Sequence, residues 1–311
     1  MSLAQPSVLV IAGPTASGKS ALALALAERL DGVVINADSQ QSYRDLPILT
    51  ARPRAAEEAR VPHRLFGTLG PMERDSAAAW ALRAATEVNA AIAFGKRPIV
   101  VGGTGLYLKA LMIGMPPMPA ISEAARDAAR ALLDEIGHAE FHARLAARDP
   151  VLGAKLKVGD TQRILRAWEV VEATGRPLSA WQADAPEPPI AATFQGIAIL
   201  PPREVLNAAG DTRFEGMLAT GALEEVRALR ATGIAEVAPI WRVLGARPLI
   251  QHIQGEIDLK AAAGLAKTAT RQYAKRQTTW FRHHFDARLI ISEQYSERLL
   301  PDIFPKVRNS G

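Results

Sequence analysis

The stretch Gly13-Pro14-Thr15-Ala16-Ser17-Gly18-Lys19-Ser20 decides the fold class of this chain. It matches the phosphate-loop pattern G-x-x-x-x-G-K-[ST] at every fixed position. An apolar run, 7–12, precedes it and a helical pattern from Lys19 to Leu30 follows, which is the context that the motif requires. The glycines let successive backbone N–H groups point at phosphate oxygens, beside the N-terminus of the following helix. The motif therefore predicts a di- or triphosphate site over Gly13 to Ser20, with Lys19 as the cation and the Ser20 hydroxyl as a ligand of Mg²⁺.

Further short apolar runs predict the remaining strands of a sheet. They lie at 33–35, 98–101, 194–200 and 288–291, and they alternate with helical patterns. Runs of this kind are typical of parallel strands that are buried on both faces. We therefore expect an α/β fold with an open parallel sheet like that of the P-loop NTPases, whose functional loops lie at the carboxyl ends of the strands.

Two proline clusters, at 115–119 and 186–189, divide the chain. Between them, 122–182 reads as helical, because Ala, Leu, Arg and Glu dominate it. We expect an α/β core formed by 1–115 and 193–311, with helices over most of 203–286, and a helical insertion at 116–192. Proline-rich joints make few cross-contacts, so the insertion is expected to move as a unit.

Composition excludes several classes of protein. Hydrophobic residues make up 48% and charged residues 22%, which argues against a disordered, collagen-like or coiled-coil protein. The chain has no cysteine, so disulfides, thiolate zinc sites and a cysteine nucleophile are excluded. That is compatible with a reducing cytoplasm, where we expect the protein to act. No apolar run approaches the ~18 residues of a membrane span, and the first apolar run reads as a strand rather than a signal peptide.

The positive charge is concentrated near the C-terminus. Residues 242–288 hold nine Lys/Arg and three acids, a net +6 against +5 for the whole chain, so the rest carries −1. Within this stretch, Arg271 and Lys275 share a helix face and Tyr273 and Trp280 are interleaved. Basic and aromatic side chains together are typical of binding to unpaired RNA bases. The alternative is a solvated basic face with buried aromatics, and charge alone leaves both open.

Two polar side chains follow predicted strands and are candidates for catalysis. Asp38 follows 33–35, and Thr104 lies in the Gly-Gly-Thr-Gly stretch that ends 98–101. Ligands of open α/β sheets bind at such strand ends. Asp38 could hold Mg²⁺ as in phosphoryl-transfer enzymes, or it could cap a helix. The histidines show no metal-ligand spacing.

Taken together, these motifs resemble the tRNA dimethylallyltransferases, also called tRNA isopentenyltransferases or the IPP transferase family. The resemblance covers roughly 7–285 and includes several segments in the same order. The matching segments are Gly13–Ser20, Asp38–Gln41 with Tyr43, Thr50–Pro53, Pro62–Arg64, Gly102–Tyr107, Gln162 and Arg163 with Arg166, and Arg271–Gln277 followed by Trp280.

The resemblance implies transfer of the dimethylallyl group of dimethylallyl diphosphate to the exocyclic N6 of the adenosine beside the tRNA anticodon, with release of diphosphate. The partners would be the anticodon stem-loop of tRNA and dimethylallyl diphosphate, with Mg²⁺ as cofactor, no membrane and a monomeric protein. Asp38 would be the general base, with Thr104 at the target adenosine. Contacts to tRNA are implied for Asp38, Ser39, Gln40, Gln41, Thr104, Arg126, Gln162, Arg163, Ile164, Leu165, Arg166, Arg242, Val243, Leu244, Gly245, Ala246 and Arg247.

The chain departs from the family pattern in two places. Ala246 stands where an aromatic residue is expected, and Ala209-Gly210 replaces an Arg-Ile pair ahead of Arg213 and Met217. These differences concern the detailed contacts of the two segments rather than the reaction.

Two other functions fit parts of the sequence. A small-molecule P-loop kinase would leave the basic C-terminal stretch unexplained. An RNA-binding NTPase switch would leave Asp38 and Thr104 without a role.

Overall fold

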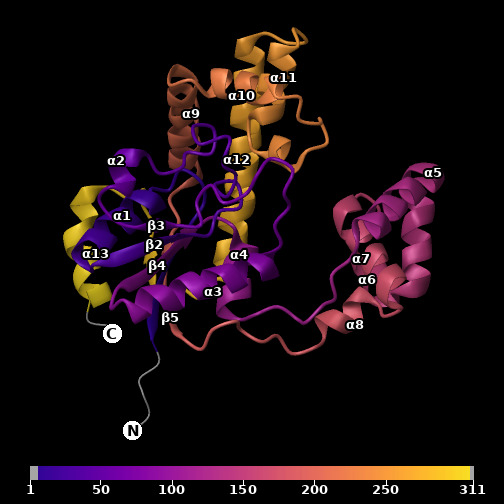
Figure 1. The fold of residues 1–311 in the computed structure, drawn as a ribbon, viewed down its shortest axis with the longest axis horizontal. Helices are drawn as coiled ribbons and strands as arrows, with labels where there is room; N and C mark the ends of the chain where they lie inside the picture. The colour runs from indigo at the N-terminus through magenta and orange to yellow at the C-terminus, as the bar shows by residue number, and fades with distance from the viewer. Residues whose placement is uncertain (1–5, 309–311) are drawn as a thin grey trace. The chain divides into compact units, whose positions relative to one another are not determined.

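The computed structural model describes residues 6–308 and confirms the α/β fold with one open sheet. Six parallel strands take the order β3-β2-β4-β1-β5-β6. Their bounds are β1 Ser7–Ala12, β2 Gly32–Asn36, β3 His63–Arg64, β4 Arg97–Gly102, β5 Thr193–Ile199 and β6 Leu289–Ile291. The carboxyl ends of β1, β2 and β4 lie next to one another, which brings the loops after them together (Figure 1).

Helices cover both faces of the sheet. On one face, Leu9 and Ile11 of β1 pack with Leu22 of α1 (Lys19–Arg29) and Ile303 of α13 (Leu300–Arg308). On the other, α3 (Ala77–Ala93) contacts β2 and β4, and it packs against α4 (Gly105–Met112). Because both faces are covered, the central strands read as continuous apolar runs in the sequence. No helix within the described residues has the length and apolar character needed to cross a membrane.

The sequence did not predict β3. It has two residues, His63 and Arg64, which pair with Val34 and Ile35 at the edge of the sheet. A strand so short and polar has no apolar periodicity to reveal it. The short helix α2 (Ala55–Glu58) precedes it.

The C-terminal helices form a second core next to the sheet. They are α9 (Arg203–Ala219), α10 (Ala222–Ala231), the 3₁₀ turn η1 (Pro239–Arg242), α11 (Ala246–Ile253) and α12 (Leu259–His284). A second 3₁₀ turn, η2 (Glu297–Leu299), precedes α13 and packs in the first core. Phe214, Trp241 and Leu249 pack there with Leu46 and Leu49 from the loop after β2. This shared core connects the loop after β2 to helices more than 150 residues further along the chain.

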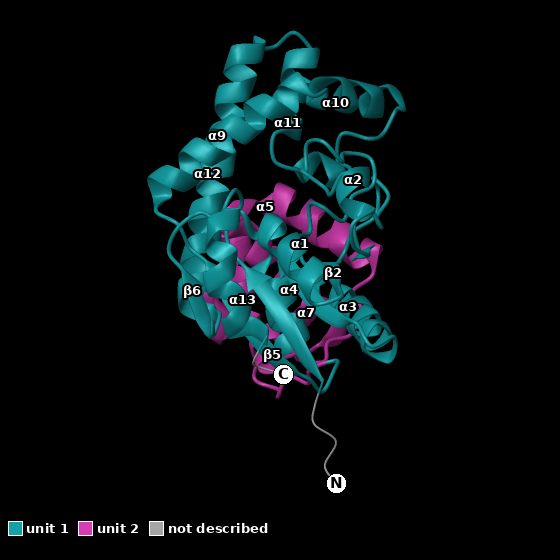
Figure 2. Cartoon of the chain, turned by 90° about the vertical axis from the view of Figure 1, so that its left-hand side faces the viewer, with its two compact units in different colours: residues 1–112, 189–311 teal, residues 113–188 magenta. Residues whose placement is uncertain are grey.

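Contacts divide the chain into two compact units, 1–112 with 189–311 and 113–188, coloured separately in Figure 2. The sequence placed the helical insertion at 116–192. The second unit contains α5 (Glu123–Arg148), α6 (Pro150–Lys155), α7 (Thr161–Thr174) and α8 (Leu178–Gln182). Phe141, Leu145 and Trp168 lie in its own apolar core. Gly137, with φ of 75°, interrupts α5 with a kink.

Candidate functional site

The phosphate loop connects β1 to α1, and close packing requires glycine at two of its positions. A Cβ on Gly13 would lie 2.6 Å from the Ile199 carbonyl oxygen. Gly18 has φ of 90°, and a Cβ there would lie 2.9 Å from Cβ of Tyr295. Side chains at either position would clash with a neighbouring backbone segment, and at Gly18 the left-handed conformation adds strain.

Lys19 is buried at the start of α1, with 8% of its surface exposed. Its Nζ donates to the Pro14 carbonyl oxygen at 3.3 Å. Burial lowers the pKa of Lys19 to about 8; the charge of Asp38 opposes this shift, and that of Arg213 adds to it. An anion bound beside Nζ would stabilise the ammonium form, because opposite charge favours the charged state.

Thr15, within the loop, is held by two helices of the C-terminal region. Its backbone N–H donates to Oε1 of Gln277 on α12 at 2.8 Å, and its hydroxyl accepts from Nη2 of Arg213 on α9. Burial lowers the pKa of Arg213, and the charge of Asp38 opposes this. The half-buried Arg213 guanidinium thus places a second cation beside the loop, and no sequence motif indicated it.

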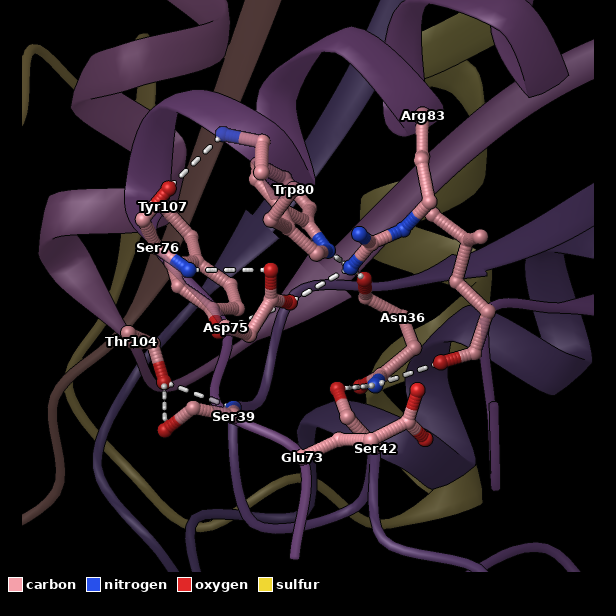
Figure 3. A network of polar contacts seen from close by, with 12 residues as sticks. Asn36, Ser39, Ser42, Glu73, Asp75, Ser76, Trp80, Arg83, Thr104 and Tyr107 are labelled. Atoms are coloured by element: carbon pink, nitrogen blue, oxygen red, sulfur yellow. Dashed lines mark hydrogen bonds and ion pairs between the residues drawn. The ribbon is translucent and has the colours of Figure 1, made fainter. Parts of the chain in front are cut away.

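Asn36, the last residue of β2, holds the backbone of Asp38 on both sides. Its Oδ1 accepts from the Asp38 N–H at 2.8 Å, and its Nδ2 donates to the Asp38 carbonyl at 3.0 Å. The Asn36 carbonyl in turn accepts from Nε1 of Trp80 at 2.9 Å (Figure 3). The Asp38 carboxylate accepts from the N–H of Gln40 at 3.0 Å through Oδ1. Asp38 therefore does stabilise the following turn, although with one oxygen only.

Thr104 lies directly beside this turn. Its Oγ1 accepts from the Ser39 N–H at 2.9 Å and donates to Ser39 Oγ at 3.2 Å (Figure 3). The two strand ends approach so closely that a Cβ on Gly102 would overlap the backbone of Ala37. The expected convergence of Asp38 and Thr104 at one edge of the sheet is thus present in the structure.

Behind these strand ends, a polar network attaches α3 to α4. Asp75 accepts from Arg83 at 2.5 Å and from the Tyr107 hydroxyl at 3.2 Å (Figure 3). Burial and the charge of Asp75 raise the pKa of Tyr107. The Tyr107 ring stacks on Trp80, with ring centroids 4.6 Å apart. This network fixes the indole that holds Asn36.

Within residues 242–247, Leu244 reaches the same site. The Leu244 N–H donates to Oε1 of Gln40 at 2.9 Å. Arg242 and Arg247 are exposed, whereas the side chains of Val243 and Ala246 are buried. An RNA contact at the two buried residues would have to use backbone atoms.

Two hollows meet at Asp38. One is polar, and it is lined by residues of the phosphate loop, including Lys19 and Ser20, together with Gln41 and Gln294. The second hollow is smaller, and it is lined both by the apolar residues Leu49, Phe214, Met217 and Leu244 and by polar residues that include Gln40, Thr270 and Tyr273. Both include Thr15, Asp38, Thr50 and Arg213. The arrangement places the cationic phosphate loop beside a smaller hollow with a partly apolar wall, and the Asp38 carboxylate lies where the two meet.

Arg126 and Gln162–Arg166 lie in the second unit. Gln162 and Arg163 are exposed on α7, and Ile164 is buried in the apolar core of that unit. Arg126 pairs with Glu123 at 2.6 Å, and Arg166 lies 3.4 Å from Glu169. Leu165 is half-buried.

Four residues of the site were not predicted from sequence motifs: Arg213, Gln277, Tyr273 and Phe214. Burial raises the pKa of Tyr273, and the side chains of Thr104 and Gln40 contact its hydroxyl. The only signal available was spacing: Tyr273 and Gln277 are four residues apart, on one face of a predicted helix. That spacing does not indicate which face is buried.

The two departures from the family pattern have different surroundings. Ala209 and Gly210 lie at the two hollows, one at each, and a Cβ on Gly210 would meet only Thr270, at 3.6 Å. Ala246 is fully buried at the first turn of α11, next to Gly245, where a Cβ would lie 2.9 Å from the Phe214 ring. Phe214 thus supplies an aromatic ring close to the position where the pattern expects one.

A magnesium site here would have few protein ligands. The described residues contain no group of three or more His, Cys, Asp or Glu side chains placed to hold a metal. The exposed Ser20 side chain lines the polar hollow. Mg²⁺ commonly takes one or two protein ligands and completes its shell with phosphate oxygens and water, so this site fits that mode.

The chain is similar in sequence and fold to known proteins. The IPP transferase family model matches 41–284. A tRNA dimethylallyltransferase of Rhodospirillum centenum is 54% identical over 90% of each chain, and one of Paramagnetospirillum magneticum is 50% identical over 99% of this chain and 97% of its own. Among solved structures, a tRNA isopentenylpyrophosphate transferase of Staphylococcus epidermidis is 30% identical, with a TM-score of 0.70, and covers 99% of this chain and 100% of its own. A eukaryotic dimethylallyltransferase acting on tRNA is 25% identical, with a TM-score of 0.80, over 98% of this chain and 80% of its own.

Proposed function

The chain belongs to the IPP transferase family, the tRNA dimethylallyltransferases, and we propose that it transfers a dimethylallyl group from dimethylallyl diphosphate to tRNA. The acceptor that we propose is the exocyclic N6 of the adenosine beside the anticodon. The observation that carries the proposal is the meeting at Asp38 of the polar hollow and the second hollow, part of whose wall is apolar.

The polar hollow suits the diphosphate. Lys19, Arg213 and the backbone N–H groups of the phosphate loop can stabilise the charge that develops on the leaving oxygens as the C–O bond breaks. Mg²⁺, which we propose Ser20 would hold together with diphosphate oxygens, would supply further charge neutralisation when bound. A nucleotide is not needed for this use of the loop.

We assign the five-carbon group to the second hollow, beside its apolar residues. Leu49, Phe214 and Met217 line it, and burial of apolar surface favours binding there. As N6 attacks the first carbon of the dimethylallyl group and diphosphate leaves, the nitrogen becomes cationic and must lose a proton. We assign that proton to the Asp38 carboxylate, which lies where the two hollows meet.

We propose that each unit contributes basic residues that bind tRNA. In the first unit these are Arg242, Arg247, Lys275 and Arg276, and in the second they are Arg163 and the half-buried Arg166. The target base has to leave its stack to reach Asp38, and an anticodon loop makes that less costly than a duplex.

The proposal is tested by incubating the protein with tRNA, dimethylallyl diphosphate and Mg²⁺. We expect diphosphate release at the rate of nucleoside modification, measured by mass spectrometry of digested tRNA. A tRNA with guanosine at the acceptor position is the matched control, because it lacks the exocyclic N6 amine. ATP hydrolysis in place of prenyl transfer would support the kinase or NTPase alternative.

A further inference from the structure

One face of α12 packs along the loops that form the site. Tyr273, Gln277 and Trp280 are spaced four and three residues apart, so they lie on this face. Tyr273 contacts Thr104 and Gln40, and Trp280 lies so close to Gly105 that a Cβ there would overlap the indole. Gln277 lies between these two aromatic residues and is 5% exposed.

Gln277 forms hydrogen bonds to two separate segments of backbone. Its Oε1 accepts from the Thr15 N–H at 2.8 Å, and its Nε2 donates to the Gly103 carbonyl at 2.8 Å. A Cβ on Gly103 would overlap Nε2, so the close approach depends on glycine at that position. The side-chain amide serves as acceptor and donor at once, because its oxygen accepts and its NH₂ group donates.

We propose that Gln277 is a positioning residue, which holds the phosphate loop and the loop that presents Thr104 in one fixed register. Through Thr15 it sets the diphosphate side of the site, and through Gly103 it sets the acceptor side. Since reacting atoms must be aligned closely, loss of this link should lower turnover more than the binding of either substrate. This inference rests on the proposed prenyl transfer.

The first test is Gln277→Leu, with Gln272→Leu as the matched control, because Gln272 is exposed on the same helix. For Gln277→Leu we expect kcat to fall about 10–100-fold, with KM for both substrates little changed. Calorimetry with inorganic diphosphate should still find one site per chain. An unchanged kcat, or a fall that equals the loss of binding-competent protein, would contradict a positioning role.

Gln277→Glu gives a second readout, which a merely structural role would not move. The ionised carboxylate can accept from Thr15 but repels the Gly103 carbonyl, whereas the protonated form again offers one acceptor and one donor. The ratio of variant to wild-type kcat should therefore rise as pH is lowered. Lys19, Asp38 and Arg213 also lie in this region. Because they are present in both the variant and the wild-type protein, the ratio of the two kcat values cancels the part of their pH dependence that the two proteins share. A ratio that is flat with pH counts against the proposal.

Gly103→Ala tests the same link from the other side. The added methyl group should lower kcat in the wild-type background. A further variant, Gln277→Ala, removes the overlap with Nε2, so Gly103→Ala should lower kcat less in that background. Equal effects in both backgrounds would show that the two residues act independently. If the wild-type protein fails to prenylate tRNA, the proposed function is wrong. If it prenylates tRNA and the variants behave like wild type, only the positioning role of Gln277 is wrong.

Discussion

Oε1 of Gln40 accepts a hydrogen bond from the Leu244 N–H at 2.9 Å, across 204 residues of sequence. Gln40 belongs to the turn that Asp38 stabilises, and Leu244 lies in the segment that leads into α11. The Gln40 side chain thus satisfies the part-buried Leu244 N–H, which would cost free energy if it had no hydrogen-bond partner. The turn after β2 and the segment before α11 are therefore parts of one site, and a base entering beside Asp38 would meet both.

The buried ammonium of Lys19 should contribute strongly to diphosphate binding. We expect Lys19→Ala to raise the Kd for dimethylallyl diphosphate about ten-fold or more, because a charge-assisted contact contributes about 1.5–3 kcal/mol. Lys260→Ala is the control, because Lys260 is exposed at the start of α12. If calorimetry shows equal affinity for dimethylallyl diphosphate in wild type and Lys19→Ala, the phosphate loop does not bind the diphosphate.

Diphosphate binding should also take up protons at alkaline pH. The pKa of Lys19 is lowered to about 8, so above that pH most of the free protein carries a neutral amine. A bound anion raises the pKa again, so that binding near pH 9 should add protons to the protein. The number is measured by calorimetry in buffers of different ionisation enthalpy. We expect the uptake to shrink below pH 8 and to be reduced in Lys19→Ala.

The phosphate loop and the convergence of Asp38 with Thr104 could be predicted, because each depends on a local pattern and on where parallel strands end. Gln277 and Arg213 could not, since their roles come from contacts with Thr15, which is distant in sequence. The local sequence also did not indicate which side chains are buried. Ile164, for example, lies within a basic motif, and yet its side chain is in an apolar core.

Neutralising true phosphate contacts should flatten the salt dependence of tRNA binding. We expect this for several of Arg163, Arg166, Arg271, Lys275 and Arg276, by roughly 0.7–0.9 in the log K against log salt slope per contact. Arg271 already pairs with Asp211, so its contribution should be smaller than that of Lys275. Arg60, whose partner is Glu28, serves as the control. Slopes that stay constant in combined variants would identify a solvated basic face.

Two glycine substitutions should change stability in opposite directions. Gly105→Ala places a methyl group into the Trp280 ring, and we expect a loss of about 1–3 kcal/mol in the free energy of unfolding. Gly264→Ala lies within α12 with nothing near its Cβ, and we expect a gain of about 0.5–1 kcal/mol. Urea unfolding followed by circular dichroism measures both, and a destabilised Gly264→Ala would show that this reading of the packing is wrong.

Asp38→Asn tests the assignment on which the chemical step depends. The substitution preserves shape, and Oδ1 of asparagine can still accept from the Gln40 N–H, so the turn should persist. The Asn36 contacts are also kept, because they involve only the backbone of Asp38. What is lost is the ability to accept a proton from the alkylated nitrogen.

Removing a general base typically costs about 10²–10⁴ in rate, so we expect single-turnover prenyl transfer by Asp38→Asn to fall by that order, with tRNA affinity little changed. Asp31→Asn is the matched control, since Asp31 is an exposed carboxylate immediately before the first residue of β2. If Asp38 instead served as a Mg²⁺ ligand, excess metal should restore part of the rate. Full activity, or activity rescued by metal, would exclude Asp38 as the base and would favour a phosphoryl-transfer role for the loop.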